Sequence, residues 1–135
     1  MCGRFYGRPT EINGWVMDRL QKAFINSARA MSHLVRYEKA IQQELIILGL
    51  AIPVAAYIAS SAATFLFLTG SLVFLLLVEV LNTGLERACD AVSRSFVKEI
   101  QIAKDCGSLA VLISIFLVGT IWLYVLARII WPLST

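Results

Sequence analysis

The sequence has few charged residues, and two long stretches contain none. Only 16% of the 135 residues are Asp, Glu, Lys or Arg, whereas about 25% is usual for a soluble domain. Hydrophobic residues make up 59% of the chain, and residues 45–78 and 106–127 carry no charge at all. This composition excludes an ordinary soluble domain and predicts a membrane protein.

Cysteine and histidine are scarce as well. Cys2, Cys89 and Cys106 are an odd set without a CxxC spacing, and His33 is the one histidine. These residues supply neither a disulfide framework nor a zinc site. The sequence also lacks a Walker motif and a glycine-rich loop between a strand and a helix, so any nucleotide site must be built from helix side chains.

The uncharged runs predict three membrane spans. Residues 45–78 would form a helix about 50 Å long, which exceeds the roughly 30 Å of a hydrocarbon core. The chain must therefore turn, and the small, weakly polar residues 60–64 are the best place. The predicted spans are residues 44–59, 65–86 and 106–127.

Residues 10–43 are predicted to form an amphipathic helix in the membrane interface, after a variable or disordered segment of residues 1–9. Trp15 and Phe24 lie on a broad apolar face, and a basic excess lies opposite, as binding to an anionic leaflet requires. An ordinary amphipathic helix against a soluble core is the alternative, but the following residues leave no such core. The charged stripe consists of Glu11, Asp18, Lys22, Arg29 and Arg36.

These elements predict a single membrane domain over residues 1–135, all-α, with the surface helix followed by three transmembrane helices. Seven of the twelve Lys and Arg residues precede residue 40, and four more lie between Arg87 and Lys104. Basic loops remain cytoplasmic, so the amino terminus and residues 87–105, a helix end and loop, are assigned to the cytoplasm. No cleavable signal peptide is visible.

The stretch from Glu79 to Asp90 contains the most unusual pattern. On a helix Glu79, Asn82, Glu86 and Asp90 fall within about 80° of one another. Like charges on one face repel, and these follow directly on an apolar run, so the pattern indicates a functional site. Glu79 would lie deepest, where a general base could meet a hydroxyl group at the lipid interface.

Glu86 with a second carboxylate could hold a hard divalent cation that is shared with nucleotide phosphates. Lys104, next to Asp105 at the start of the third span, could bind phosphate. The residue pattern also allows a structural alternative, in which Glu79 and Glu86 pair with Arg87 and Lys104 between helices. Spacing leaves this choice open.

The segments VEVLNTGLERACDAV and IQIAKDCGSLAVLIS resemble the small bacterial integral-membrane diacylglycerol kinases. The family signature has Glu, two residues, Asn-Ser/Thr, then Glu and Asp, and later Ala-Lys-Asp before the third span. Each element is present in this order. The resemblance continues through RYEKAIQQE, residues 36–44, and covers about residues 18–131. Tyr37 and Gln42 depart from the family pattern.

The resemblance implies a homotrimer in the bacterial inner membrane that uses ATP and Mg²⁺ to phosphorylate diacylglycerol to phosphatidic acid. It implies that Glu79 is the catalytic base and that Glu38 and Glu86 bind magnesium. The nucleotide-binding residues would be Arg19, Asn82, Glu86, Asp90, Lys104 and Asp105. The residues that contact the lipid substrate would be Arg19, Glu79, Ser108 and Trp122.

Three other functions remain open. An undecaprenol kinase of the same fold is the first, although KDCGS, residues 104–108, looks more like the diacylglycerol branch. A small proton-coupled transporter also uses a membrane glutamate, but would not need the basic surface helix or the Lys-Asp pair. In a non-catalytic membrane subunit, the carboxylate face would serve assembly alone.

Overall fold

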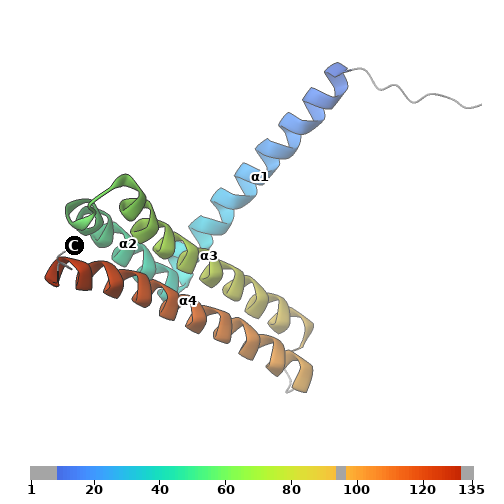
Figure 1. Cartoon of the computed structure of the whole chain (residues 1–135). Helices are drawn as coiled ribbons and strands as arrows, with labels where there is room; N and C mark the ends of the chain where they lie inside the picture. Colours follow the sequence, from blue (N-terminus) through green and yellow to red (C-terminus); the bar gives the residue numbers. More distant parts are fainter. Residues whose placement is uncertain (1–8, 94–96, 132–135) are drawn as a thin grey trace, which may run out of the picture. The chain divides into compact units, whose positions relative to one another are not determined.

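The computed structural model describes the backbone of residues 9–93 and 97–131 and the side chains from Trp15 onward within these ranges. The described residues form helices and short connections only, which confirms the predicted all-α class. The described residues contain four helices, which are labelled in Figure 1, and the chain divides into two compact units, residues 1–38 and residues 39–135. The helices are α1 (Pro9–Tyr37), α2 (Lys39–Ile58), α3 (Ala62–Val92) and α4 (Lys98–Ile130).

Helices α2, α3 and α4 are each long and apolar enough to cross a membrane, as predicted. Their bounds extend beyond the predicted spans, since α2 begins at Lys39 and α3 continues to Val92. Charge marks where the hydrocarbon ends, whereas backbone hydrogen bonding continues the helix into the polar layer. The number of spans was therefore predicted correctly, but each helix is longer than the span that the uncharged residues predicted.

The turn between α2 and α3 falls at residues 59–61, at the start of the predicted turn segment. Ser61 has extended backbone angles, and its Oγ accepts a hydrogen bond from the backbone N–H of Thr64 at 3.1 Å. A serine in this position satisfies one of the amide groups that have no partner within the helix. Ser61 therefore fixes the start of α3.

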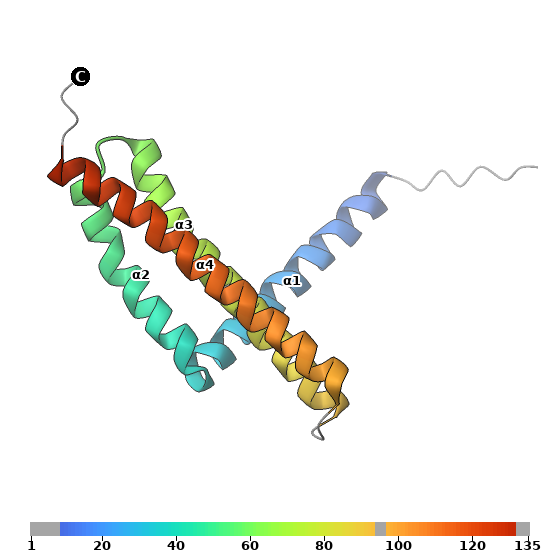
Figure 2. The same cartoon turned by 60° about the horizontal axis from the view of Figure 1, so that its bottom comes forward.

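Helices α3 and α4 lie side by side as an antiparallel pair, as Figures 1 and 2 show. The indole N–H of Trp122 on α4 donates to the backbone carbonyl of Leu68 on α3 at 3.3 Å, and Leu68 is fully buried. Helix α2 also packs against α3 and contributes the buried Ile41 and Ala55. The three helices thus form one bundle with α3 at its centre.

Hydroxyl side chains on the apolar helices bond to carbonyl groups of their own helix. Thr69 donates to Phe65 O at 2.8 Å, and Ser114 donates to Ala110 O at 2.9 Å. An unsatisfied hydroxyl in hydrocarbon would be costly, and a carbonyl one turn back is the nearest acceptor. The spans therefore carry these polar residues without needing water.

Large apolar side chains remain exposed along all three spans. Phe67, Phe116 and Leu123 are 69%, 68% and 69% exposed. A soluble chain would not leave so much contiguous apolar surface in water. Lipid tails, or other copies of the chain, must cover these faces.

Helix α1 ends at Tyr37, and Glu38 separates it from α2. The backbone N–H of Glu38 still donates to Leu34 O at 2.9 Å, so the helical hydrogen bonding stops just after this residue. Residues 39–43, which the sequence assigned to the surface helix, belong to α2. Neither glycine nor proline occurs near Glu38, and so no sequence signal marked the break.

The Trp122–Leu68 hydrogen bond predicts that substitution of Trp122 destabilises the fold more than substitution of Trp131, which directly follows α4. Trp122→Phe should lower the free energy of unfolding by about 1 kcal/mol, because one half-buried hydrogen bond is lost while an aromatic ring is kept. Trp131→Phe is the control, since Trp131 is 77% exposed. Thermal unfolding in detergent micelles, followed by circular dichroism, measures both. Equal midpoints for the two variants would contradict the structural role of the bond.

Candidate active site

The predicted polar face of α3 is present, and two of its residues are joined. Asn82 Nδ2 donates to Glu86 Oε1 at 3.2 Å, one helical turn further on. Both residues are half-buried. The bond holds one oxygen of Glu86 in place and does not involve the other. Glu86 can therefore still offer an oxygen to a ligand.

Helix α4 approaches this face closely at Gly107, which is buried. A Cβ atom at Gly107 would overlap the side-chain oxygen of Asn82, and it would also meet Leu85 Cδ2 at 3.3 Å. Only glycine lets the two helices come this close while Asn82 keeps its position. Gly107 thus belongs to the site, and the sequence analysis did not identify it.

Lys104 connects α4 to α3 through an ion pair with Asp90. Lys104 Nζ lies 2.6 Å from Asp90 Oδ1, and the two side chains are 37% and 51% exposed. The charge of Lys104 also interacts with Glu86. An ion pair this exposed contributes only about 0–1 kcal/mol to stability. It leaves the ammonium group near solvent, where an anionic ligand can reach it.

This pairing differs from the structural alternative considered from the sequence. In that alternative Glu79 and Glu86 paired with Arg87 and Lys104. The ion pair of Lys104 is with Asp90 instead, although its charge also interacts with that of Glu86. Asp90 lies one turn beyond Glu86, nearer the end of α3. Lys104 and Asp90 do join the helices, and their exposure also suits binding.

Glu79 is half-buried, and the structure places a further carboxylate near it. Glu44 on α2 is close enough for its charge to interact with that of Glu79. One oxygen of Glu44 is buried and has no hydrogen-bond partner among the described residues. Two carboxylates from two helices therefore share one region of the bundle.

The sequence did contain a signal for Glu44. Glu44 and Glu79 are the charged residues that bound the uncharged run of residues 45–78. A run that folds back near its middle brings its two ends to a similar depth, because Glu44 lies 15 residues before residue 59 and Glu79 lies 18 residues after residue 61, at a rise of about 1.5 Å per residue. The turn predicted at residues 60–64 therefore already implied that Glu44 and Glu79 lie near each other.

Asp105, Ser108 and Trp122, the remaining predicted residues of α4, differ in burial and in their hydrogen-bond partners. Asp105 accepts a hydrogen bond from Gln101 Nε2 of its own helix at 3.4 Å and is exposed. Ser108 is exposed one turn after Lys104, on the same side of α4. Trp122 is half-buried, and its indole bonds to α3. Trp122 thus has a packing contact in addition to any contact with lipid.

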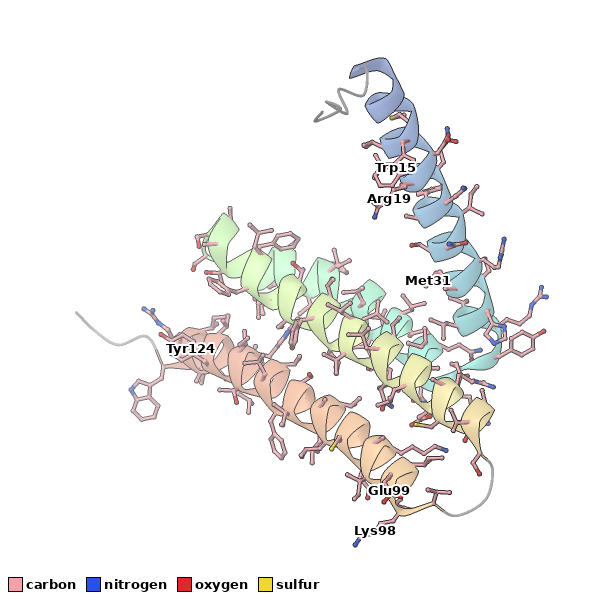
Figure 3. All side chains as sticks on the ribbon, turned by 90° about the vertical axis from the view of Figure 1, so that its right-hand side faces the viewer. Trp15, Arg19, Met31, Lys98, Glu99 and Tyr124 are labelled. Atoms are coloured by element: carbon pink, nitrogen blue, oxygen red, sulfur yellow. The ribbon has the colours of Figure 1, made fainter. Side chains whose placement is uncertain are left out.

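Arg19 and Glu38 belong to the unit of residues 1–38. The Arg19 guanidinium lies over the ring of Trp15, 4.6 Å from its centroid, and Figure 3 shows both side chains on α1. Cation–π stacking of this kind orients an exposed arginine without neutralising its charge. The location of these two residues relative to the α3 face stays a prediction from the sequence.

The cysteines are free thiols among the described residues. Cys89 on α3 is buried, and Cys106 on α4 is exposed. Within the described ranges no three His, Cys, Asp or Glu side chains form a group that could hold a metal ion. Mg²⁺ is commonly bound by one or two carboxylates together with substrate phosphates. The residues therefore allow a magnesium site that a nucleotide completes.

The fold and the polar face together define a class: a multi-pass helical membrane protein with carboxylates, an amide and a lysine gathered at one end of its bundle. The model of the prokaryotic diacylglycerol kinase family matches residues 25–126. The chain belongs to this family, and it is a lipid kinase. The matched range includes all of α3 and most of α4.

Curated relatives agree with this assignment. The chain is 33% identical over 85 residues to the diacylglycerol kinase of Escherichia coli strain K12. The matched region covers 63% of this chain and 70% of the relative. The diacylglycerol kinase of Shigella flexneri gives the same identity and coverage. Membership in a kinase family counts against the transporter and the non-catalytic subunit considered above.

Gly107 predicts a selective loss of activity. In Gly107→Ala the added methyl group forces Asn82 to rotate away from Glu86, and we expect lipid phosphorylation to fall roughly tenfold, which corresponds to about 1.4 kcal/mol in the transition state. Gly119→Ala on the same helix is the control, because a Cβ there meets nothing within 4 Å. Turnover per folded protein is measured for both variants. Matching turnover would show that the close approach has no role in the site.

Proposed function

We propose that this protein transfers the γ-phosphoryl group of ATP to the hydroxyl group of diacylglycerol and so forms phosphatidic acid, with Mg²⁺ as the metal. Membership in the diacylglycerol kinase family supports the reaction class. The observation that carries the proposal furthest is the meeting of the Asn82–Glu86 face with the Lys104–Asp90 ion pair. It gathers carboxylates and a phosphate-binding cation at one end of the bundle.

Glu79 acts as the general base in this proposal. It takes the proton from the lipid hydroxyl, whose oxygen forms a bond to the γ-phosphorus while the bond to the ADP oxygen breaks. Glu79 lies about 16 Å along α3 from Asp90 at a rise of about 1.5 Å per residue, deeper in the span than the exposed ion pair. A base at that depth suits a substrate whose chains stay in the membrane.

The other polar residues bind and orient the nucleotide. Phosphoryl transfer passes through a loose transition state, so catalysis depends mainly on positioning and charge neutralisation. Lys104 neutralises phosphate charge. Asn82 orients Glu86 through its hydrogen bond, and Asp90 orients Lys104 through the ion pair. Arg19, Asp105 and Ser108 are assigned to the edges of the site, where the nucleotide and the lipid headgroup meet. Trp122 contacts the lipid substrate further along α4.

Magnesium is held by Glu38 and Glu86 in this proposal. The second oxygen of Glu86 supports this assignment, as does the preference of Mg²⁺ for carboxylate oxygens. When bound, the metal neutralises charge on the nucleotide phosphates. Glu86 then serves two purposes, since its first oxygen remains hydrogen-bonded to Asn82.

A homotrimer in the bacterial inner membrane completes the proposal, with the amino terminus in the cytoplasm. The exposed apolar faces of the spans support assembly, because they require a cover. The concentration of basic residues before residue 40 supports the orientation. Helix α1 is assigned to the interface, where Trp15 and Phe24, which are 61% and 76% exposed, would enter the lipid layer.

ATP-dependent phosphate incorporation into lipid tests the proposal. Purified protein in mixed micelles is given diacylglycerol and undecaprenol in parallel, with and without Mg²⁺. We expect phosphatidic acid to be the preferred product. Faster phosphorylation of undecaprenol would identify the other branch of the family as the correct one.

The same assay tests Glu79. Glu79→Gln removes the base and should lower turnover by a factor of roughly 10² to 10⁴, while folding stays intact. Glu99→Gln is the control, since Glu99 is an exposed carboxylate in the first turn of α4. Figure 3 labels its position. A Glu79→Gln protein with nearly normal turnover would remove Glu79 from the proposed role.

The metal assignment makes a separate prediction. In Glu38→Ala and Glu86→Ala the Mg²⁺ concentration for half-maximal activity should rise at least tenfold, because each loses one oxygen ligand. Glu99→Ala should leave the Mg²⁺ titration unchanged. Titrations of both site variants that overlay the unsubstituted protein would exclude these carboxylates as metal ligands.

A further inference from the structure

A pocket lined by both polar and apolar side chains lies at the opposite end of the bundle from the candidate active site. It has a volume of about 250 Å³ and lies between the α2–α3 turn and the last turns of α4. Ser60 and Thr64 line one side, and Tyr124 and Arg128 line the other. Figure 3 shows Tyr124 toward the end of α4 that is remote from Lys98 and Glu99.

The pocket is too far from the active site to belong to it. Thr64 and Asp90 are separated by 26 positions on α3, which is about 39 Å at a rise of about 1.5 Å per residue. Thr64 is about 22 Å along the helix from Glu79. A span of this length places the pocket at the other membrane face.

Arg128 has no carboxylate near it among the described residues. The sequence has no Asp or Glu in residues 45–78 or after Asp105, and the described ion pair of this bundle is at the far end. An arginine placed near a lipid face without a counter-ion draws an anion or water to itself. The guanidinium presents a planar set of donors that matches a phosphate group.

The other polar groups of the pocket are donors as well. The hydroxyl groups of Ser60, Thr64 and Tyr124 can each donate to an oxygen anion. Helix α3 starts at Ala62, so its positive dipole end, about half an elementary charge, faces the same region. The carbonyl ends of α2 and α4 carry about half a negative charge each. Together they outweigh the positive end of α3, so the three helix ends contribute a net partial negative charge. The full charge of Arg128 is therefore what makes the pocket attractive to an anion.

We propose that this pocket binds the phosphate group of an anionic phospholipid in the leaflet that faces the α2–α3 turn. The apolar side chains of Ile58, Val125 and Ile129 also line the pocket, and they would contact the upper part of the acyl chains while the headgroup reaches Arg128. Free phosphate offers the same oxygens but has no apolar part for these side chains to cover. The site does not depend on the proposed kinase reaction.

Lipid binding to the full-length protein tests this site. The protein in neutral detergent is titrated separately with phosphatidylglycerol, with monoolein and with inorganic phosphate, and bound molecules are counted by native mass spectrometry. We expect Arg128→Gln to lose one phosphatidylglycerol binding event, with the apparent Kd rising roughly tenfold or more, because a charge-assisted hydrogen-bonding partner is gone. Tyr124→Phe should raise that Kd about threefold, as expected for a neutral hydrogen bond.

Lys98→Gln is the matched control, since it removes one positive charge from the other end of the same helix. It should leave this binding event unchanged. Arg128→Lys keeps the charge and should recover part of the affinity, and with Tyr124→Phe it carries the test if Arg128→Gln does not fold. Equal phosphatidylglycerol binding in Arg128→Gln and Lys98→Gln would overturn the proposal.

The titrations with monoolein and inorganic phosphate show whether the pocket recognises a phospholipid, any lipid or free phosphate. Monoolein binding that falls equally in Arg128→Gln would show a general loss of lipid contact and would also overturn the proposal. Inorganic phosphate that binds in an Arg128-dependent manner and displaces phosphatidylglycerol would assign the pocket to free phosphate instead. Arg128-dependent retention of phosphatidylglycerol alone supports the proposed lipid site.

Discussion

The cost of placing charge in a hydrocarbon layer determines how this chain is organised. The layer is about 30 Å thick, and α2 and α3 cross it with no charged residue between Glu44 and Glu79. The acidic side chains of the bundle must therefore lie at one end of it, where α2 enters the layer and α3 leaves it. The carboxylates gather there because the rest of the helix excludes them, and a cation-dependent site can form without a nucleotide-binding domain.

A second constraint, the close approach of α4 to α3, gives this end of the bundle its geometry. Gly107 brings the α4 backbone against Asn82, and Lys104, three residues earlier, then reaches Asp90. Glycine at a helix contact stabilises packing in membranes, where van der Waals contact replaces the hydrophobic effect as the main attraction. Here the same contact also holds the amide that bonds to Glu86. Packing and site geometry are consequently one property of the α3–α4 pair.

Much of this arrangement could be predicted from the sequence, and the limits have physical causes. Hydrocarbon thickness predicted the three spans, and helical periodicity predicted that Asn82 and Glu86 share a face, where they are now seen to bond. Gly107 was missed, because helix-to-helix contacts depend on the rotation of each helix about its axis, which a single sequence leaves undefined. Glu44 was missed although the predicted turn already brings it to about the depth of Glu79. The break at Glu38 was also missed, since no proline or glycine occurs beside it.

The two ends of α4 show how one helix can carry positive charge for different purposes. Lys104 lies among carboxylates, so its charge is largely balanced by Asp90 and Glu86, and a phosphate that binds there must compete with them. Arg128 has no acidic neighbour among the described residues, and the other polar side chains that line its pocket are the hydroxyl residues Ser60, Thr64 and Tyr124. A cation whose charge is balanced by neighbouring carboxylates binds an anion only weakly, which suits a nucleotide that leaves after the reaction. An unbalanced one suits an anion that stays, which is what a lipid of the opposite leaflet provides.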